Sequence, residues 1–168
     1  MPHLTKFLAK NNLKGTIIAE LNSLSSLGML VFLFSTIAQT SFVKVGLDFS
    51  SNFLTGQIEF GLSRLNLFSI NLSFNYLSGH LPGDFFSNDL VAVNIEYNML
   101  SGTIPKSFKD QSQLASLIIY ENMFNGTFPE WLCGIETLKH ISISSNQLQG
   151  SLPNCIENLS NLEGCKLK

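Results

Sequence analysis

Apolar residues recur along this chain in a fixed frame around a series of asparagines. Around Asn98, apolar residues lie eight, five and three positions earlier, and a run of the form Leu-x-Gly-x-Ile-Pro begins two positions later. The same frame fits around Asn75, Asn122 and Asn146, so the steps between asparagines are 23, 24 and 24 residues (98 − 75, 122 − 98 and 146 − 122). Self-similarity at a period of about two dozen residues is typical of a repeat protein whose coils stack along one axis.

Each repeat predicts a short strand followed by a sharp turn. The alternation in residues 93–95, Val-Asn-Ile, is typical of a strand whose side chains point to opposite faces. The asparagine at the turn can bond backbone groups of its own coil and of neighbouring coils, while the glycine allows the turn and the proline ends the pairing. One coil cannot bury its own leucines, so stacked coils must share an apolar core. We therefore expect an α/β-type solenoid with a concave parallel sheet and short helical or 3-10 turns on the convex side.

The frame is regular over residues 44–168 and irregular before them. Residues 1–43 hold about two irregular repeats, one around Asn11 and one around Ser35, and the second repeat lacks its Leu-x-Gly-x-Ile-Pro half. The apolar run at 27–38 is shorter than the roughly 20 residues that a spanning helix needs. It is either a degenerate buried coil or a signal-like segment, and the sequence leaves both open.

The last repeat stops within its strand at Lys168, and neither end carries the polar cap that a solenoid requires. We therefore expect the chain to be a piece of a longer protein. Within the regular repeats, five asparagines are assigned a structural role as a ladder. They are Asn52, Asn75, Asn98, Asn122 and Asn146.

Exposed positions of successive strands should fall into columns whose members lie about 4.8 Å apart. Reading across the repeats places two acidic and three aromatic residues in one patch, which we predict to be the ligand-binding surface because rigid aromatic side chains are favoured binding anchors. The alternative is that the rings cover the sheet as cross-strand packing. The five residues are Phe74, Glu96, Tyr97, Tyr120 and Glu121.

Composition narrows the function. Hydrophobic residues make up 45% of the 168 residues and charged residues 13%, which suits a long leucine-rich core, and the net charge of −2 provides no basic field for nucleic acid. Glu96 and Glu121 can approach each other as an acid–base pair, but an open concave sheet offers no pocket that excludes water. The three cysteines lack metal-ligand spacing. We expect neither an enzyme nor a bound metal or cofactor.

The unit L-x-x-L-x-L-x-x-N-x-L-S-G-x-I-P is nearly literal at residues 90–105, LVAVNIEYNMLSGTIP. It resembles the plant-type leucine-rich repeat, and the chain is similar to the extracellular array of plant receptor-like proteins and receptor-like kinases. The departures fall at the serine, which Thr55, Asn125 and Gln149 replace. The resemblance implies a right-handed leucine-rich repeat superhelix. It also implies that the protein lies on the extracellular side of the plasma membrane or is secreted.

The same resemblance implies part of the ectodomain of a receptor in defence or developmental signalling. Such an ectodomain would bind a peptide, carbohydrate or protein ligand, with a co-receptor beside it. The chain has no kinase signature and no clear transmembrane helix, so signalling output cannot reside in it. Two alternatives stay open: a secreted inhibitor or adaptor resembling polygalacturonase inhibitors, and a truncated gene product without a role of its own. A downstream membrane span would favour the receptor, and a closing cysteine cap the inhibitor.

Similar receptor proteins carry cysteines where Cys133 and Cys155 fall, on the returning arms of adjacent coils. The resemblance therefore implies a disulfide between them in a secreted protein, with buried free thiols as the alternative. Cys165 would then be unpaired. Trp131 is expected to pack on the returning arm.

Three N-glycosylation sequons begin at Asn71, Asn125 and Asn158. A glycan would be tolerated on the turn at Asn125 and on the convex arm at Asn158. At Asn71 a glycan would cover part of the concave surface.

Overall fold

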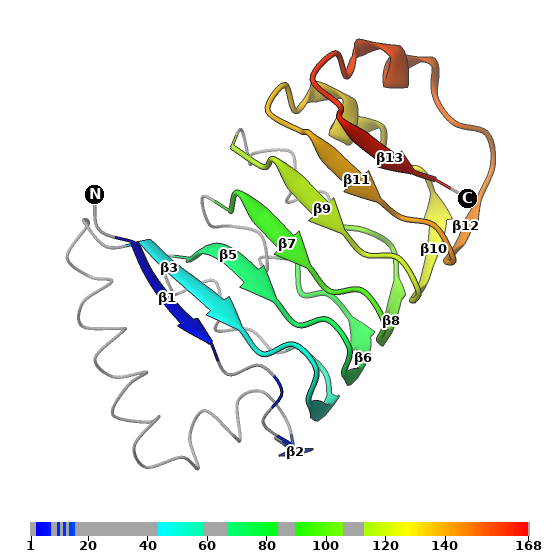
Figure 1. The fold of residues 1–168 in the computed structure, drawn as a ribbon. Coiled ribbons are helices and arrows are strands. Elements are labelled where there is room, and N and C mark those ends of the chain that lie inside the picture. Colours follow the sequence, from blue (N-terminus) through cyan, green and yellow to red (C-terminus); the bar gives the residue numbers. More distant parts are fainter. Residues whose placement is uncertain are drawn as a thin grey trace.

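The computed structural model describes residues 3–7, 10, 12, 14–15, 44–58, 67–83, 90–105 and 113–167 of the chain. Over these residues the chain winds into a stack of coils, each contributing a strand to a parallel sheet (Figure 1). The predicted solenoid with a concave parallel sheet is thereby confirmed. The apolar run at 27–38, expected to be either a degenerate coil or a signal-like segment, lies outside the described residues. In the sheet, β1 is a direct neighbour of β3.

Among the described residues, seven strands form the concave sheet in the order in which they follow along the chain. They are β1 (His3–Phe7), β3 (Lys44–Asp48), β5 (Leu67–Asn71), β7 (Ala92–Asn94), β9 (Ser116–Ile118), β11 (His140–Ser142) and β13 (Gly164–Lys166). The register follows the repeat frame. Asp48 faces Asn71, which faces Asn94, and the column continues through Ile118 and Ser142, so strand positions fall into columns as expected from the repeat.

A second parallel sheet, which the sequence did not predict, follows the asparagine turn along one side of the stack (Figure 1). Its register is slanted, because the residue three positions after one asparagine faces the residue one position after the next, as in Ser101 and Met123. Asn125 and Gln147 repeat this relation. The described strands of this sheet are β2 (Lys14–Gly15), β4 (Phe53–Gly56), β6 (Tyr76–His80), β8 (Met99–Gly102), β10 (Met123–Thr127) and β12 (Gln147–Gln149).

The apolar positions of the repeat frame form one continuous core from Leu47 to Leu159. In the coil around Asn98, Leu90, Val93 and Ile95 are completely buried. A buried aliphatic side chain of this size stabilises the fold by about 1.5–3 kcal/mol relative to an exposed one. Each coil therefore depends on its neighbours for burial, as a solenoid requires.

The ladder asparagines connect each coil to the one before it. Nδ2 of Asn98 donates to the carbonyl oxygens of Ile95 (3.2 Å) and Glu96 (3.1 Å) in its own coil and of Leu72 (3.0 Å) in the preceding coil. Its Oδ1 accepts from the backbone N–H of Leu77 (3.0 Å), also in the preceding coil. The three carbonyl groups follow the ends of the concave strands β5 and β7, so the side chain provides partners for polar backbone beyond those strands.

The same four hydrogen bonds recur at three further asparagines. They are Asn75, Asn122 and Asn146. Asn52 donates to the carbonyl oxygens of Phe49 and Ser50 in its own coil.

The glycine of the frame is required for two reasons, as Gly79 shows. Its φ of +78° lies in the region that favours glycine. A Cβ added there would also lie 2.7 Å from Cγ of Gln57 in the preceding coil. Conformation and close approach therefore exclude a side chain together.

The returning arms on the convex side contain short 3-10 helices, η3 (Glu130–Gly134) and η4 (Asn154–Asn158). Each follows the proline of its repeat, Pro129 or Pro153, which agrees with the predicted 3-10 turns. Across the part of the chain that the structure describes, no helix has both the length and the apolar character needed to cross a bilayer.

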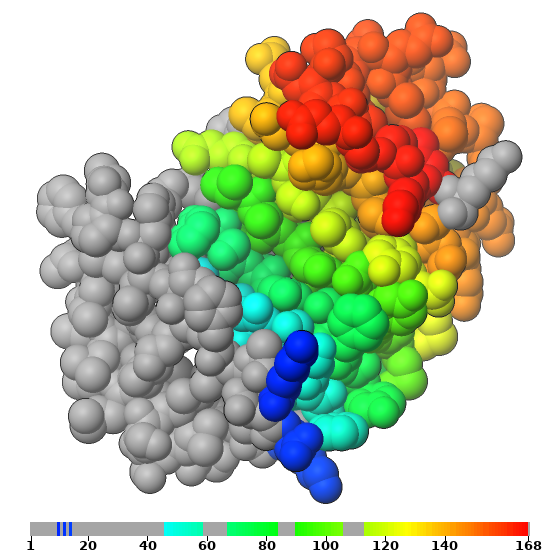
Figure 2. Space-filling view, in the orientation of Figure 1, coloured from blue at the N-terminus to red at the C-terminus, as the bar shows by residue number. Residues whose placement is uncertain are grey.

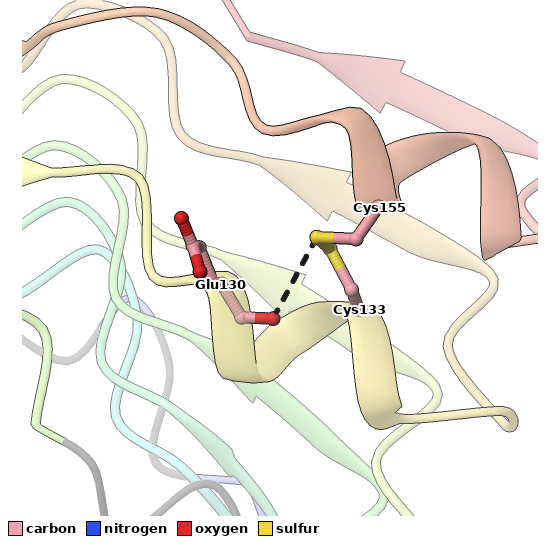
Figure 3. Close-up of a disulfide and its surroundings, with 3 residues drawn as sticks. All are labelled: Glu130, Cys133 and Cys155. Atoms are coloured by element: carbon pink, nitrogen blue, oxygen red, sulfur yellow. Dashed lines mark hydrogen bonds between the residues drawn. A yellow bond between two sulfur atoms is a disulfide. The ribbon is translucent and has the colours of Figure 1, made fainter.

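A disulfide joins η3 to η4 through Cys133 and Cys155, two positions 22 residues apart (Figure 3). Sγ of Cys155 lies 3.9 Å from the carbonyl oxygen of Glu130 at the start of η3. The bond therefore links two successive returning arms. Cys165, on β13, is free and exposed.

Candidate functional site

The five residues predicted to bind ligand lie together and form what we call the aromatic–acidic patch. Phe74, Tyr97 and Glu121 occupy one position in three successive coils, directly before the ladder asparagine. Glu96 and Tyr120 occupy the position before that. Backbone hydrogen bonds hold the coils in this register: Phe74 N–H donates to the Glu96 carbonyl, and Tyr97 N–H to the Tyr120 carbonyl, both at 3.1 Å.

The location of the patch differs from the prediction in one respect. The sequence placed these residues on the strands of the concave sheet, but β5, β7 and β9 end at Asn71, Asn94 and Ile118, two or more residues before the patch begins. The patch therefore lies on the rim where the concave sheet turns toward the second sheet. Figure 2 shows the side chains over β5, β7 and β9 as one continuous surface.

The residue directly before each ladder asparagine adopts a left-handed backbone conformation. Phe74, Tyr97 and Glu121 have φ of 56°, 51° and 52°, and Ser51 and Ser145 have 55° and 52°. For an L-residue this conformation costs about 1–2 kcal/mol. Serines adopt this conformation too, so the turn and its asparagine impose it independently of residue type. As a result, the side chain at this position projects outward. The sequence feature that marks this backbone conformation is the position directly before the ladder asparagine. The sequence analysis did not use this feature.

The rings of the patch pack against one another and stay accessible. Phe74 and Tyr97 are stacked with ring centroids 4.5 Å apart, and Tyr97 meets Tyr120 edge to face at 5.1 Å. Such pairs contribute about 0.5–1.5 kcal/mol beyond the area that they bury. Phe74 and Tyr97 are nevertheless 47% and 41% exposed. Cross-strand packing and an exposed surface are therefore both present.

Hydrogen bonds fix the acidic side of the patch. Tyr120 shares side-chain hydrogen bonds with Tyr97 and Glu96, and its pKa is raised, first by burial, then by these hydrogen bonds and by the negative charge of Glu96. Asn94 also contacts the Glu96 carboxylate, with Nδ2 donating at 3.4 Å. Glu121 is exposed. The patch thus combines two carboxylates with three aromatic rings and holds no cationic side chain.

An exposed apolar column, which sequence reasoning missed, lies on the other side of the asparagine ladder. Its members directly follow the ladder asparagines and begin the strands of the second sheet, and they are 40–51% exposed. The rings of its first two members are stacked at 6.2 Å. Sequence reasoning treated this position as unconstrained, although it is apolar in four successive repeats. The column is Phe53, Tyr76, Met99 and Met123.

Three polar residues at the strand ends of the concave sheet have structural roles. Oδ1 of Asp48, Asn71 and Asn94 each accepts a hydrogen bond from the backbone N–H two residues later, at 2.9–3.1 Å. Oδ1 of Asn71 also accepts from the Ser73 hydroxyl at 2.7 Å, so this sequon asparagine is engaged within the concave face. The other two sequon asparagines, Asn125 and Asn158, are exposed.

A hollow of about 400 Å³ adjoins the patch toward the last strand and includes Glu96, Tyr120, His140 and Lys166. Nearby, Lys139 forms an exposed ion pair with Glu163 at 3.0 Å, and this hydrogen bond is the main reason that the pKa of Glu163 is lowered. Within the described residues, no group of three histidine, cysteine or acidic side chains is arranged to hold a metal ion. The hollow thus places acidic Glu96 near basic Lys166, so both signs of charge are available to a ligand there.

The family model for the Leucine Rich Repeat matches residues 66–88 and 137–159. No curated protein matches the chain. Solved structures that are similar include the Arabidopsis receptor kinase HAESA in complex with the peptide hormone IDA and the co-receptor SERK1, at 26% identity and a TM-score of 0.79. That match covers 98% of this chain and 25% of the other, so the chain spans a quarter of the HAESA chain.

Two further structures are similar. A Pollen Receptor Kinase 3 is 29% identical with a TM-score of 0.74, and the match covers 96% of this chain and 71% of the other. The leucine-rich repeat ectodomain of the receptor kinase SOBIR1 from Arabidopsis thaliana is 25% identical with a TM-score of 0.66, covering 86% and 71%.

Proposed function

We propose that the chain is a leucine-rich repeat protein of the plant type and serves as a ligand-recognition module in the ectodomain of a plant cell-surface receptor of defence or development. It would act on the extracellular side of the membrane by binding alone, without catalysis. We further propose that the regular repeats of residues 44–168 carry recognition and that residues 1–43 form about two irregular repeats.

The aromatic–acidic patch is the observation that carries this proposal. Exposed rings on a rigid backbone lose little conformational entropy on binding, and aromatic residues dominate binding energy at interfaces. Phe74 and Tyr97 are held by stacking and by the backbone of adjacent coils, so they are pre-organised for contact. Glu96 and Glu121 supply negative charge beside them.

The partner that fits such a patch is a peptide or protein segment with a basic side chain next to apolar ones. The basic group would pair with Glu96 or Glu121, and the apolar groups would cover the rings. We restrict the proposal to peptide and protein ligands because the similar receptor HAESA is in complex with a peptide hormone and a co-receptor. A co-receptor could contact the same rim once the peptide is bound.

The test is selection of peptides from a randomised library on the immobilised chain, followed by calorimetry with single variants. We expect enriched peptides to combine arginine or lysine with aromatic or aliphatic residues. Tyr97→Ala should weaken binding by about 2 kcal/mol, the size of an interface hot spot. Phe53→Ala is the matched control. Phe53 is exposed to a similar extent, 43% against 41% for Tyr97, but Phe53 lies outside the patch.

A joint Glu96→Gln and Glu121→Gln variant tests the charge. Its binding should lose most of its dependence on salt concentration, since the screened ion pairs are removed. Selected peptides that lack basic residues and bind the Tyr97→Ala variant with unchanged affinity would rule out this surface.

A further inference from the structure

A hollow of about 700 Å³ lies beside β10 and η3, away from the aromatic–acidic patch. The buried side chains of Ile104 and Phe128 belong to its lining. Trp131 borders it too and packs against the core. Two residues that can form hydrogen bonds, Thr127 and Glu130, also line it. An indole beside hydroxyl and carboxylate groups suits a sugar ring, which has an apolar face and a polar edge.

The sequence supplies a sugar attachment point next to this hollow. Asn125, Gly126 and Thr127 form a sequon within β10. Asn125 and Thr127 are both exposed, and only Gly126 stands between them in the chain. Thr127 belongs to the sequon and to the hollow at once. A sugar on Asn125 would therefore begin at the edge of the hollow.

We propose that Asn125 carries an N-linked glycan whose first sugar packs into the hollow against Trp131. The proposal rests on the extracellular location proposed above, because the secretory pathway supplies the donor, a lipid diphosphate-linked oligosaccharide. In the transfer, Nδ2 of Asn125 forms a bond to the anomeric carbon of the first sugar. The bond from that carbon to the diphosphate oxygen breaks, the lipid diphosphate leaves, and the amide nitrogen releases one proton.

The other two sequons lack this arrangement. Asn71 lies on the concave face, where its side-chain oxygen already accepts from the backbone and the hydroxyl of Ser73. Asn158 is exposed at the end of η4 on the convex side. It is not among the described residues that line the hollow, so a glycan on Asn158 would not begin beside Trp131. Asn158 is therefore the matched control.

Trp131 is the one tryptophan of the sequence, so fluorescence excited at the red edge of the absorption band reports on this hollow alone. The chain is secreted from cells that make only oligomannose glycans, and peptide mass spectrometry measures occupancy of Asn125 and Asn158. Three forms of the same folded protein are then compared: intact, trimmed by an endoglycosidase to a single N-acetylglucosamine, and fully deglycosylated by an amidase that converts the asparagine to aspartate.

We expect Asn125 to be occupied, and Trp131 to be protected from acrylamide quenching in both the intact and the single-sugar form. Full deglycosylation should increase quenching and shift the emission to the red, and an Asn158→Gln variant should behave like wild type. An unmodified Asn125, with or without a glycan on Asn158, overturns the proposal. Identical quenching in all three forms also overturns it. Either result leaves peptide binding by the aromatic–acidic patch untouched, since that binding is measured separately.

Discussion

Oδ1 of Asn98 accepts a hydrogen bond from the backbone N–H of Leu77, which lies 21 residues earlier in the preceding coil, at 3.0 Å. Together with the three carbonyl groups that Nδ2 contacts, this bond satisfies backbone groups of two coils through one side chain. The ladder is therefore a set of connections between neighbouring coils, and its contribution to stability can be measured at a single position.

Replacing Asn98 by alanine should lower the free energy of unfolding by about 3 kcal/mol, because one N–H and three carbonyl groups each lose a hydrogen bond at a part-buried turn. Asn98→Asp should cost a similar amount, since the carboxylate keeps the acceptor but repels the three carbonyls. Urea unfolding followed by circular dichroism measures both. In protein produced without glycans, Asn125→Ala, at an exposed position, should change stability by less than about 0.5 kcal/mol. Equal effects of Asn98→Ala and Asn125→Ala would contradict the ladder.

Gly79→Ala should destabilise the fold by about 2 kcal/mol, partly from the positive φ and partly from the contact with Gln57. The two causes can be separated. Adding Gln57→Ala removes the close contact, so the double variant should recover part of the loss and retain about 1 kcal/mol from the backbone alone. Gly134→Ala is the control, because its added Cβ would meet no atom within 4 Å. Thermal unfolding measures these effects. Equal changes of the melting temperature in Gly79→Ala and Gly134→Ala would contradict a special requirement for glycine at position 79.

Removal of the disulfide by a joint Cys133→Ser and Cys155→Ser substitution should lower stability by about 3 kcal/mol, as the chain-entropy model gives for a closed loop of this length. The loss reflects the greater freedom of the unfolded chain. Chemical denaturation of both proteins measures it, and Cys165→Ser should leave the midpoint unchanged because that thiol is free and exposed. A destabilised Cys165→Ser variant would assign the covalent link to a different pair.

Tyr120 should make stability fall at alkaline pH. Its pKa in the folded protein is raised above the usual value of 10.0, so the folded state holds the proton more tightly than the unfolded chain. The contribution of Tyr120 is fully present below pH 10 and declines as the pH rises above 10. Unfolding free energies measured across this range should decline less steeply in the Tyr120→Phe variant. Identical slopes in the two proteins would show that Tyr120 does not hold its proton in this way.

The sequence was sufficient to predict the stacking, the concave sheet and its register. Leucines and asparagines recur at fixed spacing, so burial leaves only one way to align coils such as those of Asn75 and Asn98. The second sheet escaped prediction because its strands mix turn-forming glycine and serine with exposed residues, and their pairing arises between coils. No local alternation marks it.

The sequence predicted which residues lie together in the aromatic–acidic patch, but not their backbone conformation. Phe74 and Tyr97 were recognised as neighbours from the columns, but bulky residues rarely adopt a positive φ, so residue type argues against the conformation that they have. The apolar column escaped because exposed residues such as Met99 and Met123 carry no burial pattern. In the sequence, the ladder asparagine is the marker for both sets: Phe74 and Tyr97 directly precede one, and Met99 and Met123 directly follow one.

The asparagine bonds that join two coils all run backward along the chain, from each coil to the one before it in the sequence. The N–H of Leu77 therefore has this partner only when the coil of Asn98 is in place. In any stack built in this way, the last coil keeps a backbone N–H that only a following coil or a cap can pair. Extending such a stack at its C-terminal end supplies the missing acceptor to the coil before it.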